Sequence, residues 1–149
     1  MSRAGFGDDD GTYPYELWER TVENAINGKR GQKFLHELIA ALDALPEKKL
    51  ISYRLRDDTG AVCALGAVCA RKQIDTAPLE PGEDEEYLHW PPLAGALNIS
   101  ETLVRVVEHE NDEADEWCDR KLTPEGRWQH VRDWAVVLLK GDPPREGGT

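Results

Sequence analysis

The sequence predicts a mainly α-helical protein, with about five helices and one small β-hairpin in a single compact domain. Apolar residues recur at helical spacing along most of the chain, and they alternate with polar residues only over 50–56. The length of 149 residues fits one domain of roughly 100–200 residues. We expect residues 1–12 to form a flexible N-terminal arm, 13–140 the helical domain, and 141–149 a disordered tail.

Two amphipathic helices are predicted in the first third of the chain. The first covers about 14–27 and ends at Gly28, and the second covers about 32–45. Pro46 stops the second helix because proline has no backbone N–H to donate. The short GKRG junction between the helices favours an antiparallel pair.

The hydrophobic period changes at LISYRLR (50–56), where apolar and polar residues alternate as in a strand. DDTG (57–60) is typical of a turn, and AVC (61–63) can return as a partner strand. We therefore predict a small hairpin near residues 50–63, which leads directly into a helix over 63–74.

Prolines and glycines punctuate residues 75–92, which predicts a surface excursion or a pair of short turns. A short apolar helical piece follows at 93–99. Ser100 is then a good N-cap for the helix ETLVRVVEHEND. The segment Thr-Pro-Glu at 123–125 predicts the start of a last helix, which runs to about Lys140.

The net charge of −11 is concentrated in one segment. Of the 29 acidic and 18 basic residues, 13 acids and one base, Arg105, lie between Glu80 and Asp119, which leaves 16 acids and 17 bases elsewhere. Such a segment repels phosphates, so we expect no direct nucleic-acid binding through this face. It favours a protein partner with a basic surface. The simpler interpretation, a solvated acidic surface that keeps the protein soluble, stays open.

Partner contacts are predicted from this acidic segment and from two tryptophans. Neither of the two belongs to a helical stripe, that is, a row of apolar residues at helical spacing that marks the buried side of a helix. Aromatic side chains carry much of the binding energy of protein interfaces. Trp18, Trp128 and Trp134 lie on helical stripes and are assigned to the core. The candidate partner-binding residues are Glu108, Glu110, Asp112, Glu113, Asp115, Glu116, Trp90 and Trp117.

Cys63 is a candidate catalytic residue. Its predicted place between a strand and a helix N-terminus is one where the helix dipole favours a thiolate and backbone amides can hold an oxyanion. Catalysis also needs a base, such as His89, His109 or His130, and an orienting group such as Asn111. The alternative is a structural cysteine that fills a tight corner as a small hydrophobe.

Neither a metal site nor a cofactor is predicted. The cysteines lack zinc-site spacing, and the acids at 108–119 lack the DxDxDG pattern of a calcium loop. Lys29, Arg30 and Lys33 are candidate phosphate-binding residues, although GKRG is not a Walker motif. Alternatively, these bases complement the end of the first helix or pair with the acidic segment of the same or another subunit.

The sequence predicts a soluble, cytoplasmic protein that does not contact a membrane. No apolar run approaches the roughly 20 residues that cross a bilayer. The first residues, MSRAGFGDDDGTYPYE, lack the apolar core of a signal peptide. The three cysteines are therefore expected as free thiols in a reducing compartment.

Four blocks of sequence occur in this order between about residues 18 and 138: NGKRGQKFLHELIAALDALPEKKLI, the VCALGAV segment after the turn, HENDE, and TPEGRWQHVRDW. In these blocks the chain resembles a family of small proteins encoded by phages and prophages of proteobacteria. That family has no assigned activity, so the resemblance implies a genomic setting and no mechanism. A phage setting favours a protein that binds a host component in the host cytoplasm. Residues 75–92 and the surroundings of Trp117 depart from it.

We therefore expect a non-enzymatic, acidic, phage-type protein that acts by binding another protein. In the most specific form of this hypothesis, the protein inhibits a host defence nuclease or a nucleic-acid-binding protein. It would occupy the nucleic-acid groove of that protein in place of phosphates. Two alternatives stay open. One is a cysteine-dependent enzyme that uses Cys63. The other is a homo-oligomeric structural or accessory protein of the phage, in which the basic 29–33 junction meets the acidic segment of a neighbour.

Overall fold

The computed structural model describes residues 12–80, 89–114 and 122–140, with side chains from Leu17 onward. Within this part of the chain, six α-helices and one 3-10 turn follow one another, and no strand forms. The elements are α1 (Thr12–Asn27), α2 (Lys29–Ala44), α3 (Ala64–Arg71), η1 (Ala77–Leu79), α4 (Trp90–Leu97), α5 (Glu101–Asp112) and α6 (Pro124–Leu138). The predicted mainly helical class is confirmed. Residues 1–11 of the predicted arm and the whole predicted tail lie outside the described residues.

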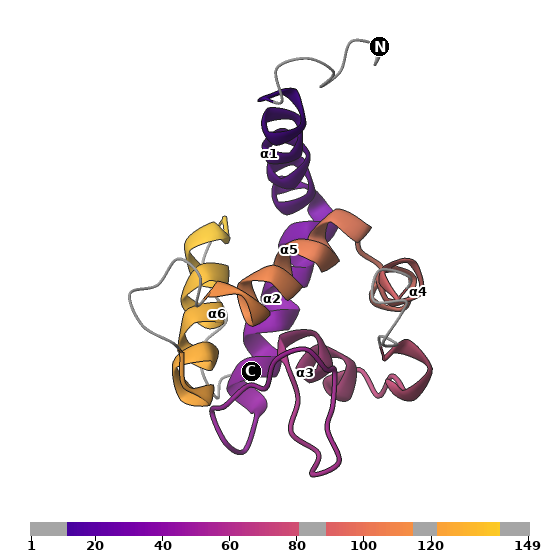
Figure 1. Cartoon of the computed structure of the whole chain (residues 1–149), viewed down its shortest axis with the longest axis vertical. Coiled ribbons are helices and arrows are strands. Elements are labelled where there is room, and N and C mark those ends of the chain that lie inside the picture. The colour runs from indigo at the N-terminus through magenta and orange to yellow at the C-terminus, as the bar shows by residue number, and fades with distance from the viewer. Residues whose placement is uncertain (1–11, 81–88, 115–121, 141–149) are drawn as a thin grey trace.

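Helix α2 lies at the centre of the fold. It packs against α3 and α6, while α5 packs against α1, α3, α4 and α6. Figure 1 shows α5 crossing α2, with α6 beside the lower half of α2 and α1 extending beyond its upper end. The core side of α2 follows helical spacing, and five of its side chains are at most 1% exposed: Phe34, Leu35, Leu38, Ile39 and Leu42.

The first two helices do not form the antiparallel pair that their short junction predicts. Only Gly28 separates them, and α2 leads away from the end of α1 (Figure 1). Helix α2 also starts at Lys29, three residues before the predicted start. Gly31 permits this, because a Cβ atom there would lie 1.9 Å from the carbonyl oxygen of Ala25 in α1. The absence of a side chain lets the two helix ends touch directly.

The predicted hairpin near residues 50–63 is wrong. Among the described residues this segment is a loop with one isolated antiparallel bridge, between Arg56 and Val62. The ladder does not extend past this bridge, because the N–H of Leu55, which could face the partner strand next, donates to a distant side chain instead. The backbone N–H groups of Leu55 and Arg56 each donate to the carboxylate of Glu80, both at 3.0 Å.

The predicted helix starts after this loop are mostly confirmed. Cys63 is the N-cap of α3. The Ser100 hydroxyl accepts a hydrogen bond from the Leu103 N–H at the start of α5, at 3.1 Å. The Thr123 hydroxyl does the same for the Gly126 N–H at the start of α6, at 2.9 Å. Each of these starts depends on one side chain and the backbone three residues ahead, so the sequence alone contains the signal.

Helix α4 begins earlier than predicted, at Trp90 rather than at residue 93. Pro91 and Pro92 occupy its first turn, where no backbone N–H is needed. Of the predicted excursion over 75–92, η1 forms a single turn, and residues 81–88 lie outside the described part of the chain. No described helix is long and apolar enough to cross a lipid bilayer.

Asn111, which is 2% exposed, fastens the end of α5 to three other parts of the fold. Its Oδ1 accepts from the Ala64 N–H at the start of α3, at 3.0 Å, and its Nδ2 donates to the Ile51 carbonyl at 2.9 Å. Its own carbonyl accepts from Arg127 Nε in α6, at 2.7 Å. Because each buried polar group left unpaired costs about 1–3 kcal/mol, this amide fixes where α5 ends.

Candidate partner-binding groove

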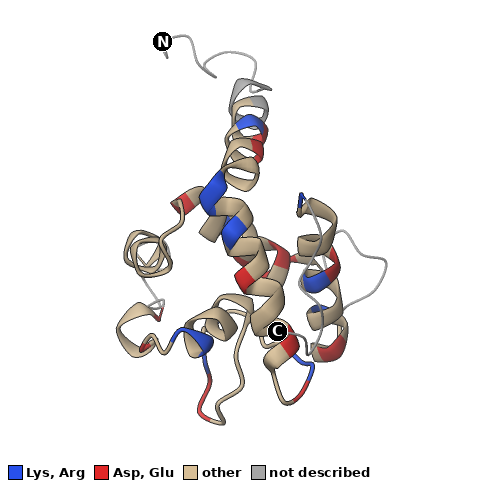
Figure 2. Cartoon of the chain, turned by 180° about the vertical axis from the view of Figure 1, so that it is seen from behind, with Lys and Arg blue, Asp and Glu red and all other residues tan. Residues whose placement is uncertain are grey.

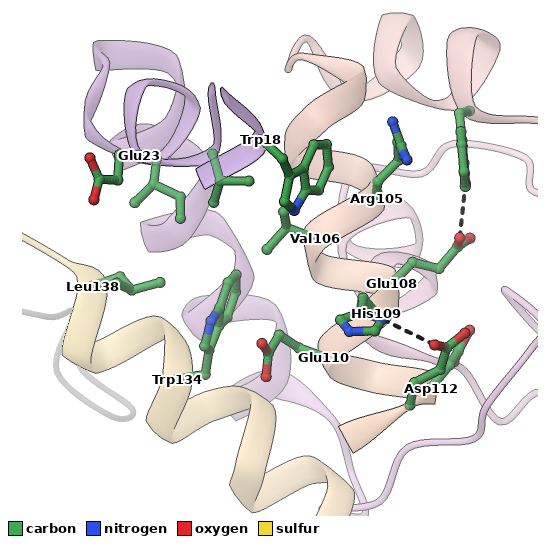
Figure 3. A pocket seen from close by; sticks show the side chains of 14 residues that line it. Trp18, Glu23, Arg105, Val106, Glu108, His109, Glu110, Asp112, Trp134 and Leu138 are labelled. Carbon is green, nitrogen blue, oxygen red and sulfur yellow. Dashed lines mark hydrogen bonds and ion pairs between the residues drawn. The ribbon is translucent and has the colours of Figure 1, made fainter. Parts of the chain in front are cut away.

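A groove of about 620 Å³ lies between α1, α5, α6 and the start of α4. Figure 3 shows α5 on one side, with α1 and α6 on the other. Aliphatic side chains of all three helices contribute to the lining, together with one arginine and one histidine. The tryptophans of the lining are Trp18, Trp90 and Trp134, and its acidic residues are Glu23, Glu108, Glu110, Asp112 and Glu113.

The structure gathers most of the predicted partner-binding residues in this groove. The five that line it are Glu108, Glu110, Asp112, Glu113 and Trp90. Four of these come from the end of α5 and its cap, and the fifth comes from the first residue of α4, which packs beside α5. The remaining three, Asp115, Glu116 and Trp117, lie outside the described residues.

Two tryptophans that the sequence assigns to the core also line the groove. Trp134 and Trp128 both pack against the edge of the core and are half-buried, and Trp134 also lines the groove. Trp18 is half-buried too, and it stacks on Arg105. A helical stripe predicts which side of a helix turns inward. It does not show whether that side meets a core or a gap between helices.

The guanidinium group of Arg105 lies between two of the indole rings. Its Cζ atom is 4.6 Å from the centroid of the Trp18 ring and 4.6 Å from that of the Trp90 ring. Both distances are within the roughly 6 Å typical of a cation–π contact. The contact joins α1, α5 and α4, so the basic residue inside the acidic segment holds one wall of the groove together.

Glu108 fixes the start of α4 against the middle of α5. Its Oε1 accepts from the indole Nε1–H of Trp90 at 2.9 Å, and its Oε2 pairs with Nε2 of His89 at 2.6 Å. The His89 side chain is 5% exposed and that of Glu108 is 23% exposed. The orientation of the Trp90 ring is therefore set by a carboxylate of the groove itself.

Two further histidines pair with glutamates of the groove. His130 Nε2 in α6 lies 2.8 Å from Glu110 Oε1, and His109 Nδ1 lies 3.1 Å from Glu113 Oε1 one turn along. With His89, three of the four histidines of the chain thus contact carboxylates beside α5. These are the histidines that the sequence offers as catalytic bases for Cys63, and the structure directs them to glutamates.

Asp112 differs from the other groove carboxylates because it is fixed by backbone and amide donors. Its Oδ1 accepts from the Tyr53 N–H at 3.0 Å and from Asn111 Nδ2 at 2.7 Å. Burial raises the pKa of Asp112 above its ordinary value of 3.8, and the charge of Glu108 adds to this, while the two hydrogen bonds and Arg127 act in the opposite direction.

No protein-family model, curated protein or solved structure matches the chain. The described residues also contain no group of three or more His, Cys, Asp or Glu side chains that could hold a metal ion. The groove brings indole rings, aliphatic side chains and carboxylates together among the described residues.

Cys63 has the properties of a structural cysteine. It is buried, and its Sγ accepts from the Gly66 N–H at 3.4 Å. Burial raises the pKa of the Cys63 thiol well above its ordinary value, and it raises the pKa of Cys69 to about 11. A thiol in this state is protonated at neutral pH and is a poor nucleophile. Asn111, the predicted orienting group, is occupied by its structural hydrogen bonds.

The phosphate candidates Lys29, Arg30 and Lys33 lie in the first turns of α2, and Figure 2 shows basic positions gathered where α1 meets α2. Lys29 and Arg30 line a smaller pocket of about 270 Å³ beside the start of α5. Arg30 Nη1 donates to Asn98 Oδ1 at 3.3 Å. None of the three candidates lines the groove.

Proposed function

We propose that this chain is a non-enzymatic interaction protein of phage type, which binds a protein partner with a basic surface through the groove. The observation that supports this most strongly is the composition of the groove, whose lining includes five carboxylates and three indole rings but a single arginine. Opposite charge increases the rate and the specificity of association. Indole rings supply contact area that loses little conformational entropy on binding.

The groove also has a suitable size and is already organised. Its volume of about 620 Å³ is within the roughly 300–1,000 Å³ of typical ligand pockets, so it admits side chains of a partner rather than a whole helix. Glu108 and Glu110 are held by histidines and Trp90 is held by Glu108. Side chains that are ordered before binding lower its entropic cost.

The resemblance to small phage-encoded proteins supports a partner from the host cytoplasm. A host defence nuclease or a nucleic-acid-binding protein has the required chemistry, because its basic groove accepts phosphates and would also accept a surface of carboxylates. The buried Cys63 thiol gives no support to the alternative of a cysteine-dependent enzyme.

The proposal predicts that charge reversal inside the groove abolishes partner capture. We would immobilise the chain, capture proteins from a bacterial host lysate, and compare the wild type with the double variant Glu23→Lys/Glu113→Lys. Glu23 is exposed and the Glu113 side chain is 41% exposed, so both tolerate lysine. Asp112 is left unchanged because it is largely buried. We expect basic proteins to be captured, with a roughly tenfold or greater loss in the variant, equivalent to about 1.4 kcal/mol.

The matched control is Glu19→Lys/Asp58→Lys, which changes the net charge equally at two exposed positions outside the groove. Glu19 lies on α1 one turn before Glu23. The control should capture the same proteins as the wild type. The proposal fails if both double variants lose capture equally, if neither loses it, or if the captured proteins are acidic.

A further inference from the structure

The groove shows, in its own packing, how it holds a guanidinium group. Arg105 is stacked between the rings of Trp18 and Trp90, and the second of these rings is anchored on the carboxylate of Glu108. The combination is an indole face for the planar cation and a carboxylate close by. Arginine is the cation that most often uses both, because it stacks on aromatic rings and forks to carboxylates.

A second indole and carboxylate combination lies across the groove. Figure 3 shows Glu110 next to Trp134, with both side chains facing the opening. In the part of the chain that the structure describes, the cation–π contacts involve Trp18, Trp90 and Trp128, and no lysine or arginine lies over Trp134. Val22, Ile26 and Leu138 contribute aliphatic surface to the same groove.

We propose that this second position binds an arginine side chain of the partner, stacked on Trp134 beside Glu110. Aliphatic residues of the same partner segment then contact Val22, Ile26 and Leu138. The inference rests on the proposed function and deepens it, because it names the ligand as a short amphipathic protein segment that carries arginine. Charge supports this occupant, since carboxylates outnumber basic side chains in the lining.

The test uses the full chain labelled with ¹⁵N, and it follows the indole N–H resonances by NMR during titration with a short peptide. The peptide carries arginine and leucine at helical spacing, and two matched peptides carry lysine or the neutral isostere citrulline in place of arginine. We expect the resonances of Trp134 and Trp18 to shift. The Trp128 resonance should stay, because its indole donates to the Leu42 carbonyl at 3.0 Å outside the groove.

Affinity should fall from the arginine peptide to the lysine peptide and then to the citrulline peptide, with at least a roughly tenfold loss for citrulline, equivalent to about 1.4 kcal/mol. Equal affinity of the arginine and citrulline peptides would overturn the inference, as would an unshifted Trp134 resonance. If the Trp134 resonance shifts with protein concentration when no peptide is present, a second copy of the chain occupies the position. That result would also overturn the inference.

Two variants test the named side chains. Glu110→Gln removes the charge and keeps an acceptor for His130, which lies 2.8 Å away. Trp134→Leu keeps apolar packing at the core edge and removes the aromatic face. Each variant should lower the affinity for the arginine peptide several-fold. Glu19→Gln, which lies on α1 outside the groove, should leave that affinity unchanged. If Trp134→Leu does not fold, Glu110→Gln still decides, because unchanged affinity in that variant contradicts the inference.

The two proposals can fail separately. If capture of the host partner depends on the charge of the groove but the arginine peptide does not shift the Trp134 resonance, the proposed function stands and the proposed arginine position is wrong. If the peptide binds as expected but host capture ignores groove charge, the position recognises arginine and the proposed partner is wrong.

Discussion

The carboxylates beside α5 have different neighbours, and this decides which of them are available to a partner. Both carboxylate oxygens of Glu108 are already in contact, with Trp90 and His89, whereas Glu110 contacts His130 through Oε1. Asp112 is hydrogen-bonded to backbone and amide donors and is largely withdrawn from water. Glu23 on α1 is exposed. The acidic lining therefore combines residues that hold the groove in shape with residues that face a ligand.

Asp112 makes stability depend on pH in a predictable direction. Its pKa is above 3.8 in the folded chain, so the folded state binds more protons and stability falls as pH rises from about 3.8 to the folded pKa. Asp112→Asn imitates the protonated form. The free energy of unfolding of the variant, relative to that of the wild type, should therefore be higher at neutral pH than at pH near 3.8.

Urea unfolding at the two pH values measures this difference. The exposed Asp58→Asn serves as a control for the loss of one negative charge. If the stability difference between Asp112→Asn and the wild type does not change with pH, burial does not raise the pKa of this carboxyl.

At the scale of elements, the groove depends on where α1 ends and α2 begins. Trp18, Val22 and Ile26 reach the groove from α1, which meets α2 at Gly28 and Gly31. Gln32 adds a second connection, because its Nε2 donates to the Ile26 carbonyl at 2.9 Å and to the Leu138 carbonyl of α6 at 3.2 Å. One turn of α2 thus positions two sides of the groove.

Gly31→Ala should destabilise the fold by about 1–3 kcal/mol or more, as overpacking does. The new Cβ atom would lie 1.9 Å from the Ala25 carbonyl oxygen and 2.8 Å from that of Ile26, and neither backbone atom can move aside alone. Gly95→Ala in α4 is the matched control, because a Cβ atom there meets nothing within 4 Å. That control should be neutral or stabilising by up to about 1 kcal/mol. Equal stability of the two variants in urea would contradict the close contact.

The sequence predicts elements well where the signal is local. The hydroxyls of Ser100 and Thr123 cap helices through backbone groups three residues ahead, so both starts could be predicted. The hairpin prediction failed because Glu80, 25 positions away, accepts the Leu55 N–H that would have continued the ladder.

The candidate site could be predicted only in part. The sequence pattern predicted five residues of the groove, four from the acidic segment and Trp90. It did not lead to Trp18, Arg105 or Trp134, because these come from three different helices and meet only in the folded chain. Helical periodicity carries no information about which separate helices will leave a gap between them.

At the scale of the whole molecule, a net charge of −11 is an unfavourable term in folding, because compaction brings like charges closer. Arg105 is the single Lys or Arg residue between Glu80 and Asp119 and offsets only a small part of the charge of the acidic segment. Pairs that are partly buried are screened by salt less than exposed charges are. Added salt therefore weakens the repulsion more than it weakens these contacts.

We expect the melting temperature to rise by a few degrees between low and moderate sodium chloride, since about 1 kcal/mol corresponds to roughly 2–8 °C for domains near this size. Calorimetry or circular dichroism measures the shift. Repeating the series with Glu19→Lys/Asp58→Lys, which carries less negative charge, should give a smaller rise. A melting temperature that falls with salt would show that screened ion pairs, and not repulsion, dominate the electrostatics of the fold.

The placement of the tryptophans has a practical consequence. Three of the five indole rings of the chain line one groove, and one of them rests on a guanidinium and donates to a carboxylate. The intrinsic fluorescence of the protein therefore comes in large part from this groove. An incoming ligand that displaces water from these rings or changes their contacts will alter the emission without any attached dye, so the molecule carries its own optical reporter of occupancy.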